Sequence, residues 1–493
     1  MILSSACTAV GQSSIRPDAD LEARLQPLAE RAMERGLIPG LQIAVVMQDG
    51  RAWTGAFGVA DMETGRRVTD ETRFYTASTS KALTALAAAQ MDYRGELDLD
   101  ATLDQAFPGG TRFHEDYDPT SVTVRDLLTH THGLQQGAIS IRVAFTGEYT
   151  NDQLLELLDQ HPPLPSRDFR YSNFGYDLVG LLMSPDVTGG WKDVVDAAVM
   201  KPLGMTHTTS YRSRIPDESL AFPHDIGAEG MKRIRLAKDD PNLGPAGGHF
   251  TTASDMARLL YAELNNGRLD GGQAIPAAVI EQSQRAQVPQ EREFLHYVRH
   301  EWAMGWDIGT YESDTVYHRP GAFAGYYSNV AFIPAHGFGV AVLANGGGAG
   351  LRVAETVVGA IYDELLGSED VLARMDAGLD QLAERLPGQQ ARLAGMMAEM
   401  TFLEKPRRSI DAYTGTYEDA AWGTVEVVEV DGELEARWGM VVSRLRPRDL
   451  EGDLFFAQIF DSDDQVTFNF ADEAAVAHSL RMRGSDFDFV RRD

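Results

Sequence analysis

The chain has 493 residues, which is too long for one ordinary hydrophobic core, so two or three domains are expected. Hydrophobic residues make up 43% and charged residues 24%, which is typical of a soluble globular protein. The 73 acidic against 44 basic residues leave a net charge of -29, which argues against nucleic acid and anionic membrane surfaces as partners.

The chain contains one cysteine, Cys7, which excludes an intrachain disulfide and a thiolate-ligated zinc site. No run reaches the roughly 18 apolar residues of a membrane span. The first residues lack the basic segment of a signal peptide, and their apolar run is too short for a working one. Ser5-Ala6-Cys7 is loosely similar to the end of a lipoprotein signal, but a plain disordered leader fits as well. We interpret residues 1–20 as a leader. The location stays open: periplasmic or lipid-anchored if the gene start is truncated, otherwise cytoplasmic.

The first two thirds of the chain alternate between helical and strand patterns. Residues 20–35 have helical periodicity, and Asp49-Gly50 is a hairpin signal between two strand patterns. The expected helices are 20–35, one beginning at Ser78, 151–159, 174–183, one capped by Thr252 or Ser254, and 351–366; the expected strands are 41–48, 51–58, 316–318, 328–333 and 339–345.

The last quarter of the chain has a different pattern. Residues 368–405 are charged and helical and are expected to act as a connector. Residues 406–493 contain a hairpin around Asp431-Gly432 and further short strands, which predicts a small β-barrel. The expected fold class is therefore α+β: residues 21–367 form an antiparallel sheet flanked by helices, with an inserted all-helical lobe, and a small antiparallel β-barrel follows.

Ser78 is the only serine in the chain that has a lysine, Lys81, three residues later. The Ala- and Leu-rich residues 82–89 predict a helix, with Ser78 at its N-terminus and Lys81 one turn later on the same face. A neighbouring amine can accept the hydroxyl proton and so activate the serine as a nucleophile. The helix N-terminus favours negative charge that develops there. The alternative is that Ser78 and Lys81 are only a polar helix start with a solvated lysine. If the motif is considered alone, this non-catalytic interpretation is favoured.

A second proton-transfer group is needed for hydrolysis, and Tyr171-Ser172-Asn173 is the candidate. A tyrosine at a loop–helix junction can point into a cleft, and a nearby cationic lysine would lower its pKa. Two other Tyr-x-Asn triplets exist, Tyr149-Thr150-Asn151 and Tyr327-Ser328-Asn329, but the first is typical of a helix cap and the second enters a strand. Tyr171 is therefore favoured by its context.

A third candidate is the strand end Tyr317-His-Arg-Pro-Gly-Ala-Phe-Ala-Gly-Tyr326. A basic residue shortly before glycine can offer a cation and let a substrate approach the backbone. A structural histidine followed by a Pro-Gly turn is about equally compatible with the pattern.

These three segments, in this order, resemble those of the penicillin-recognising serine hydrolases: class C β-lactamases, low-molecular-weight D,D-carboxypeptidases, D-aminopeptidases and their esterase relatives. The resemblance covers roughly residues 25–366 and implies a β-lactamase/transpeptidase-like fold. The tail resembles the lipocalin-like domain of some peptidase and esterase members. The further matching segments are Val124-Arg-Asp-Leu-Leu-Thr-His-Thr-His-Gly-Leu134, Pro202-Leu-Gly-Met205 and Gly244-Pro-Ala-Gly-Gly-His-Phe-Thr-Thr-Ala-Ser-Asp255.

The resemblance implies a role for each site residue. Ser78 is the acylated nucleophile, Lys81 and Tyr171 share the general base and acid roles, and Asn173 contacts the substrate or Lys81. The oxyanion is held by the backbone N–H groups of Ser78 and of Ala322, if the alignment has no gap.

The third motif departs from the family pattern of Lys- or His-x-Gly. His318 is three residues before Gly321, whereas the spacing from Gly325 puts the basic position at Arg319. Neighbouring strand residues face opposite ways, so His318 and Arg319 cannot both occupy this position. The spacing favours Arg319, which could bind a substrate carboxylate through two hydrogen bonds.

Several rival interpretations remain. His130-Thr-His132 and His114-Glu-Asp116 do not have metal-ligand spacing, and structural or exposed histidines are favoured by about 5 to 1. The Gly-x-Ser-x-Gly elbow of α/β-hydrolases is absent. A non-catalytic penicillin-binding sensor or assembly protein would usually lack Ser78, Lys81 or Tyr171.

We therefore expect an acyl-enzyme hydrolase without metal or organic cofactor, acting on a small molecule or a short peptide. The favoured substrates are D-amino-acid peptides or small esters, with β-lactams as the alternative, because dedicated β-lactamases usually lack an extra C-terminal domain. The oligomeric state is left open.

Overall fold

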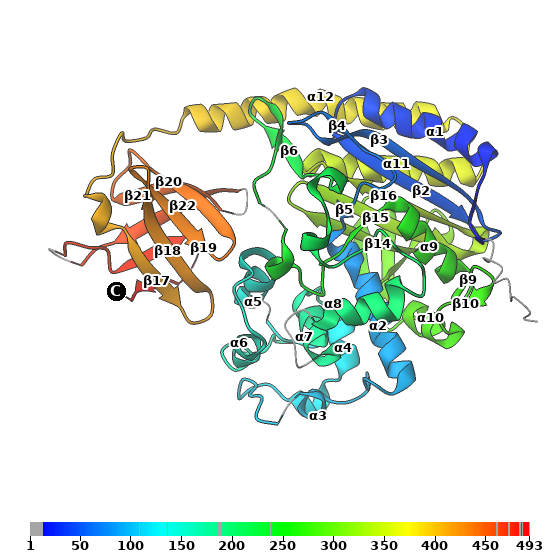
Figure 1. The fold of residues 1–493 in the computed structure, drawn as a ribbon, viewed down its shortest axis with the longest axis horizontal. Coiled ribbons are helices and arrows are strands. Elements are labelled where there is room, and N and C mark those ends of the chain that lie inside the picture. The colour runs from blue at the N-terminus through cyan, green and yellow to red at the C-terminus, as the bar shows by residue number, and fades with distance from the viewer. Residues whose placement is uncertain are drawn as a thin grey trace, which may run out of the picture.

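A computed structural model describes residues 13–492 except residues 108, 136, 185–189, 237, 460–461, 472–473, 483–484 and 486. Cys7 and most of the expected leader lie outside the described residues. Figure 1 shows a larger part built around the main sheet and a smaller barrel beside it, with one long helix leading from the first to the second.

The main sheet joins strands from both ends of the larger part. Its order is β1-β3-β2-β16-β15-β14-β13-β12-β11, with β4 paired to β3. All of these neighbours are antiparallel except β1 and β3. The strands are β1 (Arg16–Pro17), β2 (Gly40–Met47), β3 (Arg51–Asp61), β4 (Arg66–Arg67), β11 (Val288–Phe294), β12 (Tyr297–Trp302), β13 (Asp307–Tyr311), β14 (Asp314–Phe323), β15 (Tyr326–Ile333) and β16 (Phe338–Ala344).

Helices cover both faces of this sheet. On one face, α1 (Ala19–Glu34) and α11 (Gly348–Leu365) enclose a hydrophobic cluster with the strands. On the other face, α9 (Ala253–Leu264) packs on β2 and β16, and α2 (Ser80–Arg94) belongs to the same second cluster. Every residue of α2 from Ser80 to Met91 is buried, because its alanines allow close packing on all sides.

The predicted helical lobe lies between the two sets of strands in the sequence (Figure 1). This arrangement confirms the predicted α+β class with helices flanking an antiparallel sheet. The lobe contains α3 (Leu103–Ala106), α4 (Val124–Leu128), α5 (Gly137–Ile141), the π-helical turn η3 (Arg142–Thr146), α6 (Asn151–Glu156), α7 (Phe174–Met183), α8 (Gly190–Val195) and the turn η4 (Asp196–Met200).

Short elements complete the larger part. They are β5 (Phe74–Tyr75) paired with β8 (Phe250–Thr251), the hairpin of β6 (His224–Gly227) and β7 (Gly230–Arg233), the hairpin of β9 (Arg268–Leu269) and β10 (Gly272–Gln273), α10 (Ala277–Gln284), and the 3-10 turns η1 (Ala77–Thr79), η2 (Pro119–Ser121), η5 (Arg212–Arg214), η6 (Asp217–Ser219), η7 (Asp240–Asn242) and η8 (Pro334–His336).

Strands β11, β12 and β13 were not predicted from the sequence. They form the edge of the sheet farthest from β1, and their charged side chains hide the apolar alternation. The guanidinium of Arg299 on β12, for example, lies 4.2 Å above the ring of Phe294 on β11. A long cationic side chain that covers an aromatic ring serves as apolar surface although its sequence letter is polar.

The C-terminal region forms the predicted barrel. Helix α12 (Val371–Ala398) spans most of the expected connector, and the strands after it close into an eight-stranded antiparallel barrel. The strands are β17 (Gly415–Asp419), β18 (Gly423–Val430), β19 (Glu433–Trp438), β20 (Val441–Pro447), β21 (Asp453–Ile459), β22 (Ser462–Asn469), β23 (Ser479–Met482) and β24 (Phe489–Arg491), and the turn η9 (Ile410–Ala412) precedes them.

The barrel contacts the helical lobe through η3. Ile141 and Phe145 pack against the hydrophobic core of the barrel. Arg142 Nη2 donates a hydrogen bond to Ala420 O (3.1 Å), and Met440 N donates one to Thr146 O (2.8 Å). The barrel therefore supports one short segment of the lobe.

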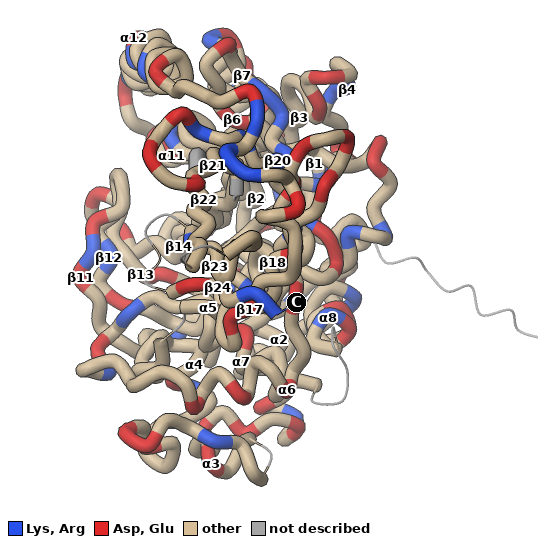
Figure 2. Tube along the Cα trace, turned by 90° about the vertical axis from the view of Figure 1, so that its left-hand side faces the viewer, with Lys and Arg blue, Asp and Glu red and all other residues tan. Residues whose placement is uncertain are grey.

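Charged residues of both signs are interspersed along the trace (Figure 2). Within the described part of the chain, no helix is both long enough and apolar enough to cross a membrane.

Candidate active site

Ser78 lies in a tight turn that precedes the buried helix α2. It is the middle residue of η1, and Ala77 before it has a left-handed backbone with φ of 46°. An alanine rarely adopts this conformation, and such strain is typical of functional turns. Ser78 is only partly buried, whereas Thr79 and Ser80 after it are fully buried.

Hydrogen bonds join this turn to the sheet. Thr79 Oγ1 donates to Arg319 O on β14 (2.8 Å), and Ser328 Oγ on β15 donates to Thr76 O (2.7 Å). A Cβ atom on Gly321 would lie 2.0 Å from Thr76 O, so only glycine allows β14 to pass this close to the turn.

Lys81 and Tyr171 both reach the Ser78 hydroxyl. The Tyr171 hydroxyl donates to Ser78 Oγ (2.8 Å), and Lys81 Nζ lies 3.5 Å from the same oxygen. Lys81 Nζ also donates to Asn173 Oδ1 (2.7 Å) and to Ala246 O (2.8 Å). The structure thus brings together the four residues expected from the first two motifs, with Asn173 in contact with Lys81.

The surroundings shift the pKa values of Lys81 and Tyr171 in the direction that proton transfer needs. Burial lowers the pKa of Lys81 below its ordinary value. Burial acts to raise the pKa of Tyr171, but the charges of Lys81 and Arg319 and the hydrogen bonds with Lys81 and Ser78 outweigh it, so the pKa of Tyr171 is lowered. A pair with two lowered pKa values releases one proton closer to neutral pH than either side chain would alone.

His318 and Arg319 face opposite sides of β14. The ring of His318 stacks on Tyr297 at 4.0 Å, and burial lowers the pKa of His318 well below its ordinary value, so the imidazole is neutral. Arg319 instead lies over Tyr171, 5.3 Å from the ring centre. Of the two candidates for the third motif, only Arg319 is on the side of Ser78.

Arg319 is paired within the protein. Its side chain is 5% exposed, and Nη1 lies 3.2 Å from Asp307 Oδ2. The side chains of Arg292 and Arg299 approach the same carboxylate, at 3.2 and 3.6 Å from Asp307 Oδ1. Arg319 is therefore held as a fixed positive charge beside Tyr171, and it does not line the pocket in front of Ser78.

A pocket of about 440 Å³ opens in front of Ser78. Ser78, Asn173 and Ala322 line it, so the two residues whose N–H groups are expected to hold the oxyanion, Ser78 and Ala322, border the same cavity. The sequence did not indicate two ionisable residues that also line it, Asp177 and Lys238.

Asp177 and Lys238 are almost completely buried, with exposures of 4% and 6%. Asp177 had a usable signal, because it is a lone charge in the apolar helix α7 and lies four residues after Asn173, on the same helix face. Lys238 had none: in the sequence it belongs to a short basic cluster that resembles an exposed loop.

The two histidines of the rejected metal motif have structural surroundings. His130 is buried, accepts a hydrogen bond from Ser172 N on Nδ1 (3.1 Å), and lies 4.7 Å from the Tyr171 ring. His132 is also buried, and the backbone N–H of Leu134 donates to its Nδ1 (3.0 Å). Among the residues that the structure describes, no group of three or more His, Cys, Asp or Glu side chains is arranged to hold a metal ion.

Comparisons with known proteins show the family and the fold of the chain. The family model Beta-lactamase matches residues 25–361. Penicillin-binding protein 4 of Amycolatopsis lactamdurans is 27% identical over 381 residues, which is 73% of this chain and 92% of that protein.

Two solved structures share the fold. The D-amino acid amidase from Ochrobactrum anthropi SV3, complexed with D-phenylalanine, has a TM-score of 0.60 at 19% identity and covers 71% of this chain and 100% of its own. The octameric penicillin-binding protein homologue from Pyrococcus abyssi has a TM-score of 0.57 at 19% identity and covers 96% of this chain and 100% of its own. The family match spans well over half of the sequence, so the chain belongs to the beta-lactamase family of serine hydrolases related to penicillin-binding proteins.

Proposed function

We propose that the protein hydrolyses its substrate through an acyl-enzyme on Ser78. The observation that carries this proposal is the contact of the Ser78 hydroxyl with both Tyr171 (2.8 Å) and Lys81 (3.5 Å), in a residue that lines a pocket. A serine that has a proton acceptor within hydrogen-bond reach meets the first requirement for nucleophilic catalysis.

In the proposed reaction, the Lys81–Tyr171 pair removes the proton of Ser78 Oγ as this oxygen attacks the substrate carbonyl carbon. The N–H groups of Ser78 and Ala322 donate to the oxyanion that forms. The pair then passes the proton to the leaving amine or alkoxide, and the carbon–leaving-group bond breaks. Water attacks the acyl-enzyme by the same route in reverse, which releases the acid and restores Ser78.

Arg319 is proposed to act through Tyr171. Its charge lowers the pKa of Tyr171, and its pairing with Asp307 keeps it in place. This role replaces our expectation that Arg319 binds a substrate carboxylate, because the guanidinium is buried and does not line the pocket. His318 is proposed to be structural.

The substrates that we favour are D-amino-acid peptides and amides or small esters. Fold similarity to a D-amino acid amidase and the barrel beside the lobe support this class. A β-lactamase remains the alternative, which the similarity to a penicillin-binding protein supports.

The test is active-site labelling with a fluorophosphonate and a fluorescent penicillin, read by intact mass and peptide mapping. We expect one label on the peptide that contains Ser78 and none in Ser78→Ala. A label that persists in Ser78→Ala, or a wild-type protein that turns over substrates without ever being labelled, would overturn the proposal. A panel of D-alanyl peptides, D-amino acid amides, nitrophenyl esters and a chromogenic cephalosporin would then distinguish the substrate classes.

A further inference from the structure

Asp177 is a buried carboxylate that lines the pocket in front of Ser78. The proposed reaction gives this residue no role. It follows Asn173 by four residues on α7, so it lies on the same helix face about 6 Å further along the axis. Asn173 contacts Lys81, and both Asn173 and Asp177 line the pocket in front of Ser78. Asp177 is therefore beside the catalytic centre but outside the Ser78–Lys81–Tyr171 contact.

The carboxylate of Asp177 lacks a partner on one oxygen. The side chain is 4% exposed, and its Oδ1 atom accepts no hydrogen bond from any described residue. The backbone N–H of Ala246 bonds to the carboxylate. A buried carboxylate with an unpaired oxygen is costly for the folded protein, so this position calls for a donor that the chain itself does not supply.

The two nearby lysines are committed to other acceptors. Lys81 Nζ donates to Asn173 Oδ1 and Ala246 O. Lys238 Nζ donates to the carbonyl oxygens of Ala144 and Asn242 and lies 3.9 Å from the centre of the Phe323 ring. Both lysines act on Asp177 through their charge, but within the described ranges neither donates a hydrogen bond to its Oδ1 atom. The carboxylate is thus left open to a ligand.

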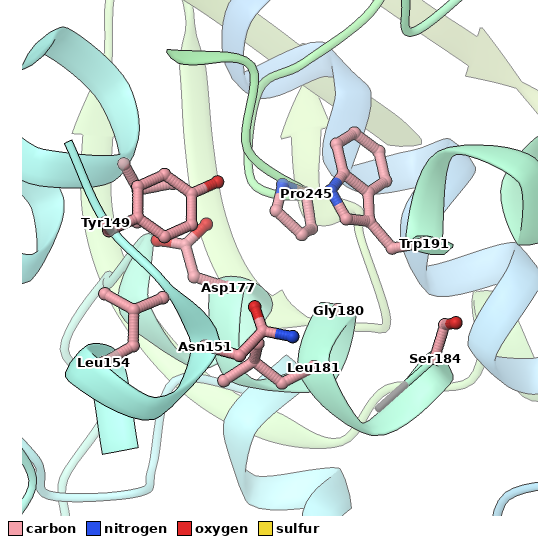
Figure 3. A pocket seen from close by; sticks show the side chains of 10 residues that line it. Tyr149, Asn151, Leu154, Asp177, Gly180, Leu181, Ser184, Trp191 and Pro245 are labelled. Carbon is pink, nitrogen blue, oxygen red and sulfur yellow. The ribbon is translucent and has the colours of Figure 1, made fainter. Parts of the chain in front are cut away.

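A second chamber meets the pocket at Asp177. Asp177 and Val143 line both cavities, and the rest of the chamber includes Tyr149, Trp191 and Pro245 (Figure 3). Among the described residues that line the chamber, Asp177 is the only charged one. One carboxylate in a mostly apolar chamber suits an ammonium group attached to a hydrocarbon. A metal ion would need further ligands, and the described residues offer no such group.

From these observations, and on the basis of the proposed function, we infer that Asp177 binds an ammonium group on the acyl part of the substrate. The scissile carbonyl then lies at Ser78, and the ammonium lies at Asp177, where the pocket meets the chamber lined by Tyr149 and Trp191. The assigned substrate class is an amide, peptide or ester of an amino acid with a free amine. N-acylated substrates lack the charge that Asp177 would bind.

The raised pKa of Asp177 is the one expected of a buried carboxylate without a cationic partner. Burial raises it to about 7, against the charges of Lys81 and Lys238 and the N–H of Ala246; Tyr75 and Tyr149 also interact with this carboxylate. Because the folded pKa is above the ordinary 3.8, ionisation of Asp177 costs the folded state stability as the pH rises from about 4 through 7. Asp177→Asn should therefore raise the melting temperature at pH 8, whereas loss of a purely structural carboxylate should lower it.

The main test compares matched substrates that differ only in the amine: D- and L-phenylalanine 4-nitroanilides and benzyl esters, each free or N-acetylated. We expect the wild-type protein to prefer the free amine by about tenfold or more in kcat/KM, because a buried charge-assisted hydrogen bond has this strength. Asp177→Asn should remove most of this preference through KM and leave the N-acetyl substrates within about threefold of wild type. The matched control is Glu263→Gln, which neutralises another buried carboxylate with a pKa raised to about 7 by burial, away from the pocket; it should preserve the preference.

A binding experiment separates this inference from the proposed function. Calorimetry with Ser78→Ala should detect phenylalanine amide, and binding should weaken about tenfold or more in Ser78→Ala/Asp177→Asn and for 3-phenylpropionamide, which lacks the amine. Amine-dependent binding by a protein that never becomes acylated would refute the proposed function and support the site. Turnover with no preference for the free amine in the wild-type protein, or an equal loss on both substrates in Asp177→Asn, would overturn the site.

Discussion

Two buried lysines differ in their surroundings: Lys81 contacts Ser78, and Lys238 lines the pocket in front of Ser78. Lys81 on α2 is surrounded by side chains that can exchange protons or position the substrate: Ser78, Tyr171 and Asn173. Lys238, shortly before η7 in the sequence, donates to two backbone carbonyl oxygens and lies against an aromatic ring. Burial lowers the pKa of both lysines, that of Lys238 to about 7.

This difference shows that a shifted pKa does not by itself make a lysine catalytic. Carbonyl oxygens cannot release or accept protons at neutral pH, so the contacts of Lys238 only join η3 to the segment around η7. Lys81 has a titratable phenol and a nucleophile beside it. The partners, and not the burial, distinguish the lysine proposed to act in catalysis from the structural one.

Of the substitutions that test this difference between the two lysines, replacement of Lys81 should have the largest effect on the acylation rate. We expect Lys81→Ala to lower the rate of Ser78 acylation by about 10³- to 10⁴-fold, since the proton acceptor and the charge that lowers the Tyr171 pKa are both lost. The measurement is the second-order rate of fluorophosphonate labelling on a protein with an unchanged circular dichroism spectrum. A rate near that of the wild type would remove Lys81 from the mechanism.

Tyr171→Phe tests the partner of Lys81. We expect the acylation rate to fall by about 10²- to 10³-fold, because Ser78 loses the group within 2.8 Å while Lys81 remains. Stopped-flow acylation with a chromogenic ester provides the measurement. Near-normal kinetics in a folded variant would show that Lys81 acts alone.

Arg319 and His318 provide a matched pair on the two faces of one strand. The charge of Arg319 lowers the pKa of both Tyr171 and Lys81, so in Arg319→Ala the acid limb of the pH–rate profile should move to higher pH. If the midpoint of that limb moves by about one pH unit, the rate at a fixed pH on the limb falls by about tenfold. His318→Ala should leave the midpoint unchanged while it lowers the melting temperature, since it removes a buried ring that stacks on Tyr297. The opposite result would reverse the assignment of the third motif.

The smallest effect on chemistry is expected for Lys238→Met. Its loss leaves the carbonyl oxygens of Ala144 and Asn242 without their donor, so the melting temperature should fall by several degrees. Acylation should change by less than about tenfold, because no proton passes through this side chain. A loss of acylation as large as that of Lys81→Ala would show that Lys238 also takes part in the reaction.

Much of the fold could be predicted from the sequence because local patterns were strong. The hairpin at Asp49-Gly50, the helix 174–183 and the strands around residues 328–344 had the periodicity of their observed elements. Strands β11 to β13 were missed because charged side chains at a sheet edge conceal the alternation. Strands β17 and β20 of the barrel were also missed, although its overall class was expected.

The pairing of Ser78 with Lys81 was readable from the sequence alone, because residues three apart on a helix share a face. Tyr171 and Asn173 were indicated by their context and by the family resemblance. The sequence also reduced the third motif to two neighbouring residues, since adjacent strand positions face opposite ways. Only the tertiary structure decided whether His318 or Arg319 lies on the side of Ser78, because this depends on the packing of β14 against the turn that holds Ser78. Long-range packing likewise decided that Lys238 is buried and that Asp177 lines the pocket, because burial depends on segments distant in the chain that no local pattern records.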